Sequence, residues 1–186
     1  MKRRLLLTWL TLAATAQALP GDSVYQLDAK LTDQRGQALK LDAGRGQPVL
    51  VSMFYTSCQF VCPMLIEAAS ATQAALPAAD RQRLKVLLIS FDPARDTPAK
   101  LEAMAKERSL DGSQWTLART DPATVRKIAA LLKFQYRALP DGEFNHSAEL
   151  ILLDGDGRIA ARTTMLAGAD ERMVSAIRKL GGSARP

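Results

Sequence analysis

Two nearly continuous apolar runs limit the folds that are open to this chain. Residues 47–55 read QPVLVSMFY, and residues 85–92 read KVLLISFD. Uniformly apolar runs of this length are typical of strands that are buried on both faces of a sheet. Between them, residues 64–76 (MLIEAASATQAAL) predict a helix, with Pro63 in its first turn. We therefore expect a buried pair of parallel strands joined by a helix.

Two further helices are predicted by a start signal that occurs twice. Thr97–Pro98 precedes the sequence AKLEAMAKERSL, and Asp121–Pro122 precedes ATVRKIAALLKF. Threonine and aspartate suit the N-cap position, and proline suits the first helical position, where its missing N–H has no partner to lose. A last helix is predicted from the amphipathic sequence DERMVSAIRKL at residues 170–180.

Two hairpins complete the expected elements. Residues 25–42 alternate in hydrophobicity around Asp33–Gly36, and residues 148–163 place the turn GDG between AELILLD and RIAART. The sequence DGDG at residues 154–157 is too short for a calcium loop and is taken as that turn. This order of elements predicts an α/β protein of the thioredoxin-like fold, with a mixed central sheet flanked by helices and an extra N-terminal β-hairpin.

The N-terminal residues have the pattern of an export signal. Lys2–Arg4 are followed by an apolar core at residues 5–16 and by the small-x-small site Ala16–Ala18. The apolar run ends too early for an uncleaved anchor, since a membrane helix needs about 20 apolar residues. We expect a signal peptide at residues 1–18, a single domain at residues 19–186, and a periplasmic location.

Charge is modest once this segment is set aside. The formal net charge of +6 includes three cations and no acids in residues 1–18, so the mature chain carries 6 − 3 = +3. No cluster of Lys and Arg interleaved with aromatic residues remains, and nucleic acid is therefore not an expected partner. Export also places the chain in an oxidising compartment, where two nearby cysteines form a disulfide by default.

The two cysteines of the chain fall where an α/β sheet places its ligands. Cys58 lies in the loop after the first buried strand, and Cys62 lies at the start of the next helix. The helix N-terminus favours thiolate, so we expect both thiols to ionise near neutral pH. A purely structural disulfide would close too short a loop to stabilise much. Redox pairs of the C-x-x-C type have two intervening residues; the three here leave room for an ion. Spacing alone does not decide between metal binding and redox chemistry.

His146, the single histidine, lies just before the strand AELILLD. In a thioredoxin-like fold, the loop that enters this strand faces the cysteine loop. We therefore expect His146 to be a third ligand rather than an ordinary hydrogen-bonded side chain. Structural zinc sites take four protein ligands, and no fourth Cys or His exists, although a carboxylate or water keeps zinc open. Thiolates select Cu(I), so copper is the favoured ion.

Three segments together resemble the SCO/SenC family of thioredoxin-like copper proteins. They are GQPVLVSMFYTSCQFVCP, LLISFDPARDTPAKLEAMA and FNHSAELILLDGDGRI, in this order. The resemblance implies that Cys58, Cys62 and His146 bind copper. Cu(I) is the expected oxidation state, and Cu(II) is the alternative. It further implies a metallochaperone that delivers copper to, or matures, the Cu(A) centre of cytochrome c oxidase.

The resemblance also implies a set of partners. These are a copper acceptor, such as the Cu(A) subunit of the oxidase, and a periplasmic thiol reductant, with membrane contact only through the partner. The alternative function is a thiol–disulfide reductase in which Cys58 and Cys62 are the redox-active pair and act on the cysteines of a periplasmic copper protein.

The element D-P-x-R-D-T-P is matched by residues 92–98, and we interpret four of its residues as turn and cap residues: Asp92, Pro93, Asp96 and Pro98. Two positions depart from the family pattern. Gln59–Phe60 stand where many members have Pro–Asp, and Asn145 stands where many have Asp.

Two methionines, Met53 and Met64, flank the cysteine loop. Their sulfurs suit copper, but both lie in apolar segments and are expected in the core.

Overall fold

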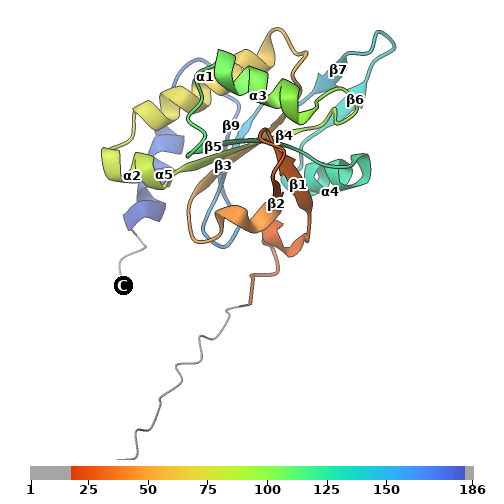
Figure 1. Cartoon of the computed structure of the whole chain (residues 1–186). Coiled ribbons are helices and arrows are strands. Elements are labelled where there is room, and N and C mark those ends of the chain that lie inside the picture. Colours follow the sequence, from red (N-terminus) through yellow and green to blue (C-terminus); the bar gives the residue numbers. More distant parts are fainter. Residues whose placement is uncertain (1–17, 183–186) are drawn as a thin grey trace, which may run out of the picture.

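A seven-stranded mixed sheet forms the centre of the computed structural model, which describes residues 18–182 (Figure 1). The strand order is β2-β1-β5-β4-β3-β8-β9. The strands are β1 (Lys30–Asp33), β2 (Ala38–Lys40), β3 (Val49–Phe54), β4 (Lys85–Ser90), β5 (Trp115–Arg119), β8 (Leu150–Leu153) and β9 (Ile159–Thr163). The helices are α1 (Val61–Ala74), α2 (Ala78–Arg83), α3 (Pro98–Glu107), α4 (Pro122–Leu132) and α5 (Glu171–Gly182). Two short 3₁₀ helices, η1 (Val24–Gln26) and η2 (Leu41–Gly44), flank the first hairpin.

The predicted pair of buried parallel strands is confirmed. All six residues of β3 are buried, as are five of the six residues of β4. The two strands pair in parallel, with Met53 beside Ile89, and β8 runs antiparallel on the other side of β3. Because β3 has a neighbour on each side and helices over both faces, an uninterrupted apolar sequence is what its position requires.

Right-handed connections account for two helices on one face of the sheet. Figure 1 shows α1 and α3 over that face and α4 on the other. The crossovers β3-α1-β4 and β4-α3-β5 join parallel strands and step in the same direction, so right-handed connections put α1 and α3 on the same face. The predicted caps are confirmed. The Thr97 side chain accepts from the Lys100 N–H, and Asp121 accepts from the N–H groups at the start of α4.

The predicted N-terminal hairpin β1–β2 is confirmed, and it extends the sheet beyond β5, where no pairing was predicted. β1 pairs with β5 over two residues, and the side chain of Gln34 continues the contact. Its amide donates to the Trp115 carbonyl at 3.2 Å and accepts from the Leu117 N–H at 3.0 Å. The hairpin formed by β8 and β9 is confirmed as well.

Besides η1 and η2, four elements were not predicted, and one of them changes the place of the histidine. These are α2, β5 and the two strands of a separate sheet, β6 (Tyr136–Ala138) and β7 (Phe144–His146). The sequence interpretation put His146 in a loop immediately before a strand. The structure places it instead at the end of β7, and residues 147–149 lead on to β8.

The predicted signal peptide lies almost wholly outside the described residues. Within residues 18–182, no helix is both long and apolar enough to cross a membrane.

One edge of the sheet collects the segments of interest. Parallel strands β3 and β4 end there, and antiparallel β8 begins there. The cysteine loop, the loop at residues 91–97 and the β6–β7 hairpin therefore meet at this edge, as open α/β sheets arrange their binding loops.

Candidate metal centre

The cysteine loop uses one sulfur to complete a helix terminus. α1 begins at Val61, and its N-cap residue Phe60 makes no side-chain capping hydrogen bond. The N–H of Cys62 instead donates to the Cys58 sulfur at 3.3 Å. Cys58 thus takes the place of a capping acceptor, where the partial positive charge of the helix start stabilises a thiolate. Cys58 is partly exposed, whereas Cys62 is only 1% exposed.

The two thiols differ in acidity, which corrects the expectation that both ionise near neutral pH. Burial opposes ionisation of Cys58, but hydrogen bonds from Cys62 and from the N–H groups of Phe60 and Val61 lower its pKa below that of an ordinary thiol. For Cys62, burial raises the pKa far above the ordinary value, and the neighbouring Cys58 charge adds to this effect. The expectation therefore fails for Cys62, because a helix start cannot offset such complete desolvation.

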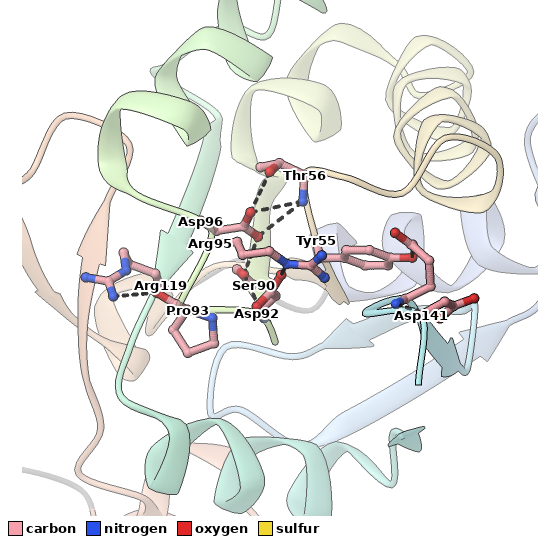
Figure 2. Close-up of polar contacts among 10 residues, drawn as sticks. Tyr55, Thr56, Ser90, Asp92, Pro93, Arg95, Asp96, Arg119 and Asp141 are labelled. Atoms are coloured by element: carbon pink, nitrogen blue, oxygen red, sulfur yellow. Dashed lines mark hydrogen bonds and ion pairs between the residues drawn. The ribbon is translucent and has the colours of Figure 1, made fainter. Parts of the chain in front are cut away.

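A fully buried carboxylate anchors the cysteine loop to the end of β4 (Figure 2). Asp96 accepts hydrogen bonds from the Thr56 N–H at 3.1 Å and from the hydroxyl groups of Thr56 and Ser90 at 2.5 Å each. Sequence reasoning assigned Asp96 only to a turn or cap and missed this role. The partners lie 40 and 6 residues away along the chain, so no local pattern contains the signal.

His146 reaches the two cysteines from the β6–β7 hairpin. One ring nitrogen of His146 and the sulfurs of Cys58 and Cys62 all lie within 4.8 Å of one another. The Nδ1 atom is 2.6 Å from the Ser147 carbonyl oxygen. A carbonyl can only accept, so Nδ1 carries the proton and the lone pair for a metal is on Nε2.

Aromatic rings surround the imidazole. The ring centroid of His146 lies 5.6 Å from Tyr55, 5.1 Å from Phe91 and 6.2 Å from Phe134. The contact with Tyr55 is edge-to-face, and the contact with Phe134 is stacked. These rings restrict the orientation of the imidazole, and sequence reasoning did not identify them as part of the site.

The triad has nearly the spacing that a single ion requires. Metal–sulfur bonds of about 2.3 Å place two sulfurs on one ion at most about 4.6 Å apart. Among the described residues, no carboxylate joins Cys58, Cys62 and His146 in this group. A structural zinc site would therefore lack its fourth protein ligand, whereas a soft ion of low coordination number fits the donors that are present.

Two apolar side chains next to the thiols are exposed, and for one of them the prediction was burial. Met53 is fully buried, as expected, but Met64 is 45% exposed, so its assignment to the core was wrong. Phe60, between the two cysteines, is 79% exposed.

The fold and this site define a class: a thioredoxin-like protein with two thiols at the start of its first long helix and an imidazole brought beside them. The SCO1/SenC family profile matches residues 19–181. The chain belongs to the SCO1/SenC family.

Individual relatives agree with this assignment. A protein of Stutzerimonas stutzeri that is provisionally named as copper-binding is 28% identical over 137 residues, which are 70% of this chain and 64% of the relative. The chain thus spans less than two thirds of that relative's length. The structure of Bradyrhizobium japonicum ScoI with copper bound is 29% identical, with a TM-score of 0.70, over 82% of this chain and 96% of that chain. Copper-bound yeast Sco1 is 18% identical, with a TM-score of 0.70, over 85% and 88% of the two chains, and shares the fold. The predicted fold class is confirmed.

Proposed function

We propose that this chain is a copper carrier that holds one Cu(I) on Cys58, Cys62 and His146 and passes it to an acceptor protein. The observation that carries the proposal is the convergence of these three side chains, from a loop, a helix and a separate hairpin, to within 4.8 Å. Two thiolates and one imidazole are donors that favour a soft ion. Copper-binding names and copper-bound structures among the relatives support the same ion.

The bound copper ion would be accessible to an acceptor protein. Cys58 is partly exposed, so an acceptor thiolate can approach the ion from that side and replace the ligands one at a time. Capture needs both thiols reduced, so a disulfide between Cys58 and Cys62 must first be opened by an external thiol. We place this exchange in the periplasm, on the basis of the N-terminal signal pattern, with the Cu(A) subunit of cytochrome c oxidase as the acceptor.

An anaerobic Cu(I) titration of the reduced protein against a competing chelator tests the proposal. We expect one Cu(I) per chain, loss of binding in Cys58→Ser and Cys62→Ser, and at least about tenfold weaker binding in His146→Ala. Asn145→Ala is the matched control, because Asn145 is exposed and points to the other face of the same strand. Undiminished affinity in His146→Ala would remove the histidine from the site.

A second candidate function, thiol–disulfide reduction, is favoured by the unequal exposure of the two cysteines. The accessible sulfur of Cys58 attacks a partner disulfide and forms a mixed disulfide while one partner thiolate leaves. Cys62, 1% exposed, then loses its proton, which the released partner thiolate takes up, and attacks the Cys58 sulfur as a thiolate. The second partner thiolate leaves, and two electrons have passed to the partner as the Cys58–Cys62 disulfide forms.

Reduction of a disulfide-bonded acceptor peptide by metal-free protein separates the two functions. A carrier binds copper tightly and reduces the peptide slowly. Rapid reduction that a copper chelator does not alter, together with negligible copper binding, would identify the chain as a reductase. In that case His146→Ala should retain the ability to transfer electrons.

A further inference from the structure

The hairpin that carries His146 is attached to the rest of the protein by aromatic packing and by few hydrogen bonds. The ring centroid of Phe91 lies 5.2 Å from those of Tyr136 and Phe144 and 5.1 Å from that of His146. β6 and β7 pair only with each other, in a sheet separate from the central one. Within residues 18–182, one hydrogen bond joins residues 136–146 to another element. The Tyr55 hydroxyl donates to Glu143 Oε2 at 2.6 Å. An isolated two-stranded hairpin is at best marginally stable in water, so this hydrogen bond and the ring contacts together decide where it lies.

Tyr55 contacts both the hairpin and the imidazole. It directly follows β3, three residues before Cys58, and is 3% exposed. Its ring centroid lies 5.2 Å from that of Phe144 and 5.6 Å from that of His146. Because Tyr55 belongs to the segment that leads to the thiols, it fixes the hairpin relative to the cysteine loop and not merely relative to the core.

Arg95 closes this contact from a third segment. Its guanidinium carbon lies 5.9 Å from the Tyr55 ring centroid and 5.6 Å from the Phe144 ring centroid. The same guanidinium pairs with Asp92 in the loop after β4 (Figure 2). A cation over two aromatic faces attracts both rings, so Arg95 helps to hold the hairpin ring against Tyr55.

We propose that Tyr55 and Glu143 are positioning residues for the metal site, and that their hydrogen bond keeps the imidazole of His146 within bonding distance of both sulfurs. The inference rests on the proposed copper-binding function and adds a determinant outside the ligand triad. Without the bond, the two thiolates still bind the ion, but the hairpin samples positions in which the imidazole does not reach it.

The competing explanation is that the bond only stabilises the fold. The two explanations differ in a His146→Ala background. A positioning residue acts on the metal through the imidazole, so removing the imidazole removes its effect. A residue that stabilises the cysteine loop or the whole fold weakens binding in both backgrounds.

The test compares Tyr55→Phe, Glu143→Ala and Glu143→Gln, each with and without His146→Ala, by anaerobic Cu(I) competition. Tyr55→Phe removes only the hydroxyl, and the glutamine oxygen can still accept from it. With His146 present, we expect about tenfold weaker Cu(I) binding in Tyr55→Phe and Glu143→Ala, and near-normal binding in Glu143→Gln. The double variant Tyr55→Phe/Glu143→Ala should lose no more than either single variant, since both remove one bond.

X-ray absorption of the copper-loaded proteins supplies a readout that a purely structural role would not move. Fewer nitrogen neighbours are expected around copper in Tyr55→Phe and Glu143→Ala than in the wild type. Arg137→Ala is the control, because Arg137 is exposed on the same hairpin and should change neither measurement. Equal losses with and without His146, or full affinity with the nitrogen neighbour retained, would overturn the proposal.

Hydrogen exchange of the metal-free protein separates a failure of this inference from a failure of the proposed function. The N–H groups of Leu139 and Ser147 close the hairpin through the carbonyls of Glu143 and Gln135. In Tyr55→Phe and Glu143→Ala, we expect these amides to exchange several-fold faster while those of β3 and β4 are unchanged. Unchanged exchange at Leu139 and Ser147 overturns the positioning role, whether or not the wild type binds copper.

Discussion

The cysteine segment and the β6–β7 hairpin bring ligands to one site with very different support. The cysteine segment follows β3, which is buried along its whole length and paired on both sides. Asp96 anchors the cysteine segment by accepting from the Thr56 N–H. The hairpin has three residues in each strand and pairs only with itself. The positions of the two sulfurs are therefore set by the central sheet, whereas the position of the imidazole is set by the β6–β7 hairpin, which does not pair with that sheet. Substitutions on the two sides should therefore have separable effects.

The largest effect is expected on the cysteine side, at the buried carboxylate. Asp96→Ala leaves the hydroxyl groups of Thr56 and Ser90 and one N–H without their acceptor. We expect the free energy of unfolding to fall by about 2–4 kcal/mol, measured by urea denaturation. Exposed Glu107→Ala is the control and should change it by less than about 0.5 kcal/mol. A loss below 1 kcal/mol for Asp96→Ala would show that the main sheet alone holds the loop.

The next effect is a pH dependence of copper binding that comes from the thiols. Burial keeps Cys62 protonated in the metal-free protein, because its pKa is raised, while hydrogen bonds lower the pKa of Cys58. Binding must release the Cys62 proton, so apparent affinity rises with pH by about tenfold per unit, or about 1.4 kcal/mol. Below the pKa of Cys58 a second proton is released, and the slope doubles.

Competition titrations between pH 6 and pH 9 measure this slope. We expect the part of the slope that comes from Cys62 to remain in His146→Ala, because the buried thiol belongs to the cysteine segment and not to the hairpin. A pH-independent affinity would contradict the assignment of a protonated Cys62.

The smallest effect is expected where the chain leaves α4 towards the hairpin. Lys133 has a φ of 53° at the C-cap of α4, a left-handed conformation that glycine adopts without steric cost. Lys133→Gly should raise the free energy of unfolding by about 0.5–1 kcal/mol. Ser109, with a φ of 52° after α3, is the other non-glycine residue of positive φ among residues 18–182, and Ser109→Gly should give a similar gain. Copper affinity should not change in either variant. A change in Lys133→Gly alone would show that the left-handed backbone conformation of Lys133, ahead of the β6–β7 hairpin, affects the copper affinity of the site.

Much of the fold could be predicted because its signals are local. The apolar runs of β3 and β4 and the cap pairs Thr97–Pro98 and Asp121–Pro122 each occupy fewer than ten consecutive residues, and the structure confirms them. The approach of His146 to the cysteines was also expected, because the fold class places the segment before β8 near the cysteine loop.

The β6–β7 hairpin was missed although a turn signal was present. Pro140-Asp141-Gly142 separates two short strands, and Gly142 has a φ of 84°. Asp141 accepts from the Glu143 N–H, as aspartate commonly does in turns. Strands of three residues are too short for alternation to be recognised, so the turn alone would have had to indicate them.

The contacts around the site could not be predicted from a single sequence. The Tyr55–Glu143 hydrogen bond spans 88 residues, and the bonds of Asp96 to Thr56 span 40. Nothing in the composition of either segment specifies its partner. Such contacts follow from the way the sheet edge brings loops together, and they become visible only when the whole fold is known.

The hydrogen bond from His146 to residue 147 also bears on how sequences of this kind can diverge. Its acceptor is a main-chain oxygen, so exchanging the side chain at position 147 does not delete it. The conformation of the backbone at residues 146 and 147 therefore determines which ring nitrogen of His146 is left to bind the metal. The tautomer of His146 thus does not depend on the side chain at position 147, whose hydroxyl serves another contact and accepts from the Gln135 N–H at 3.1 Å.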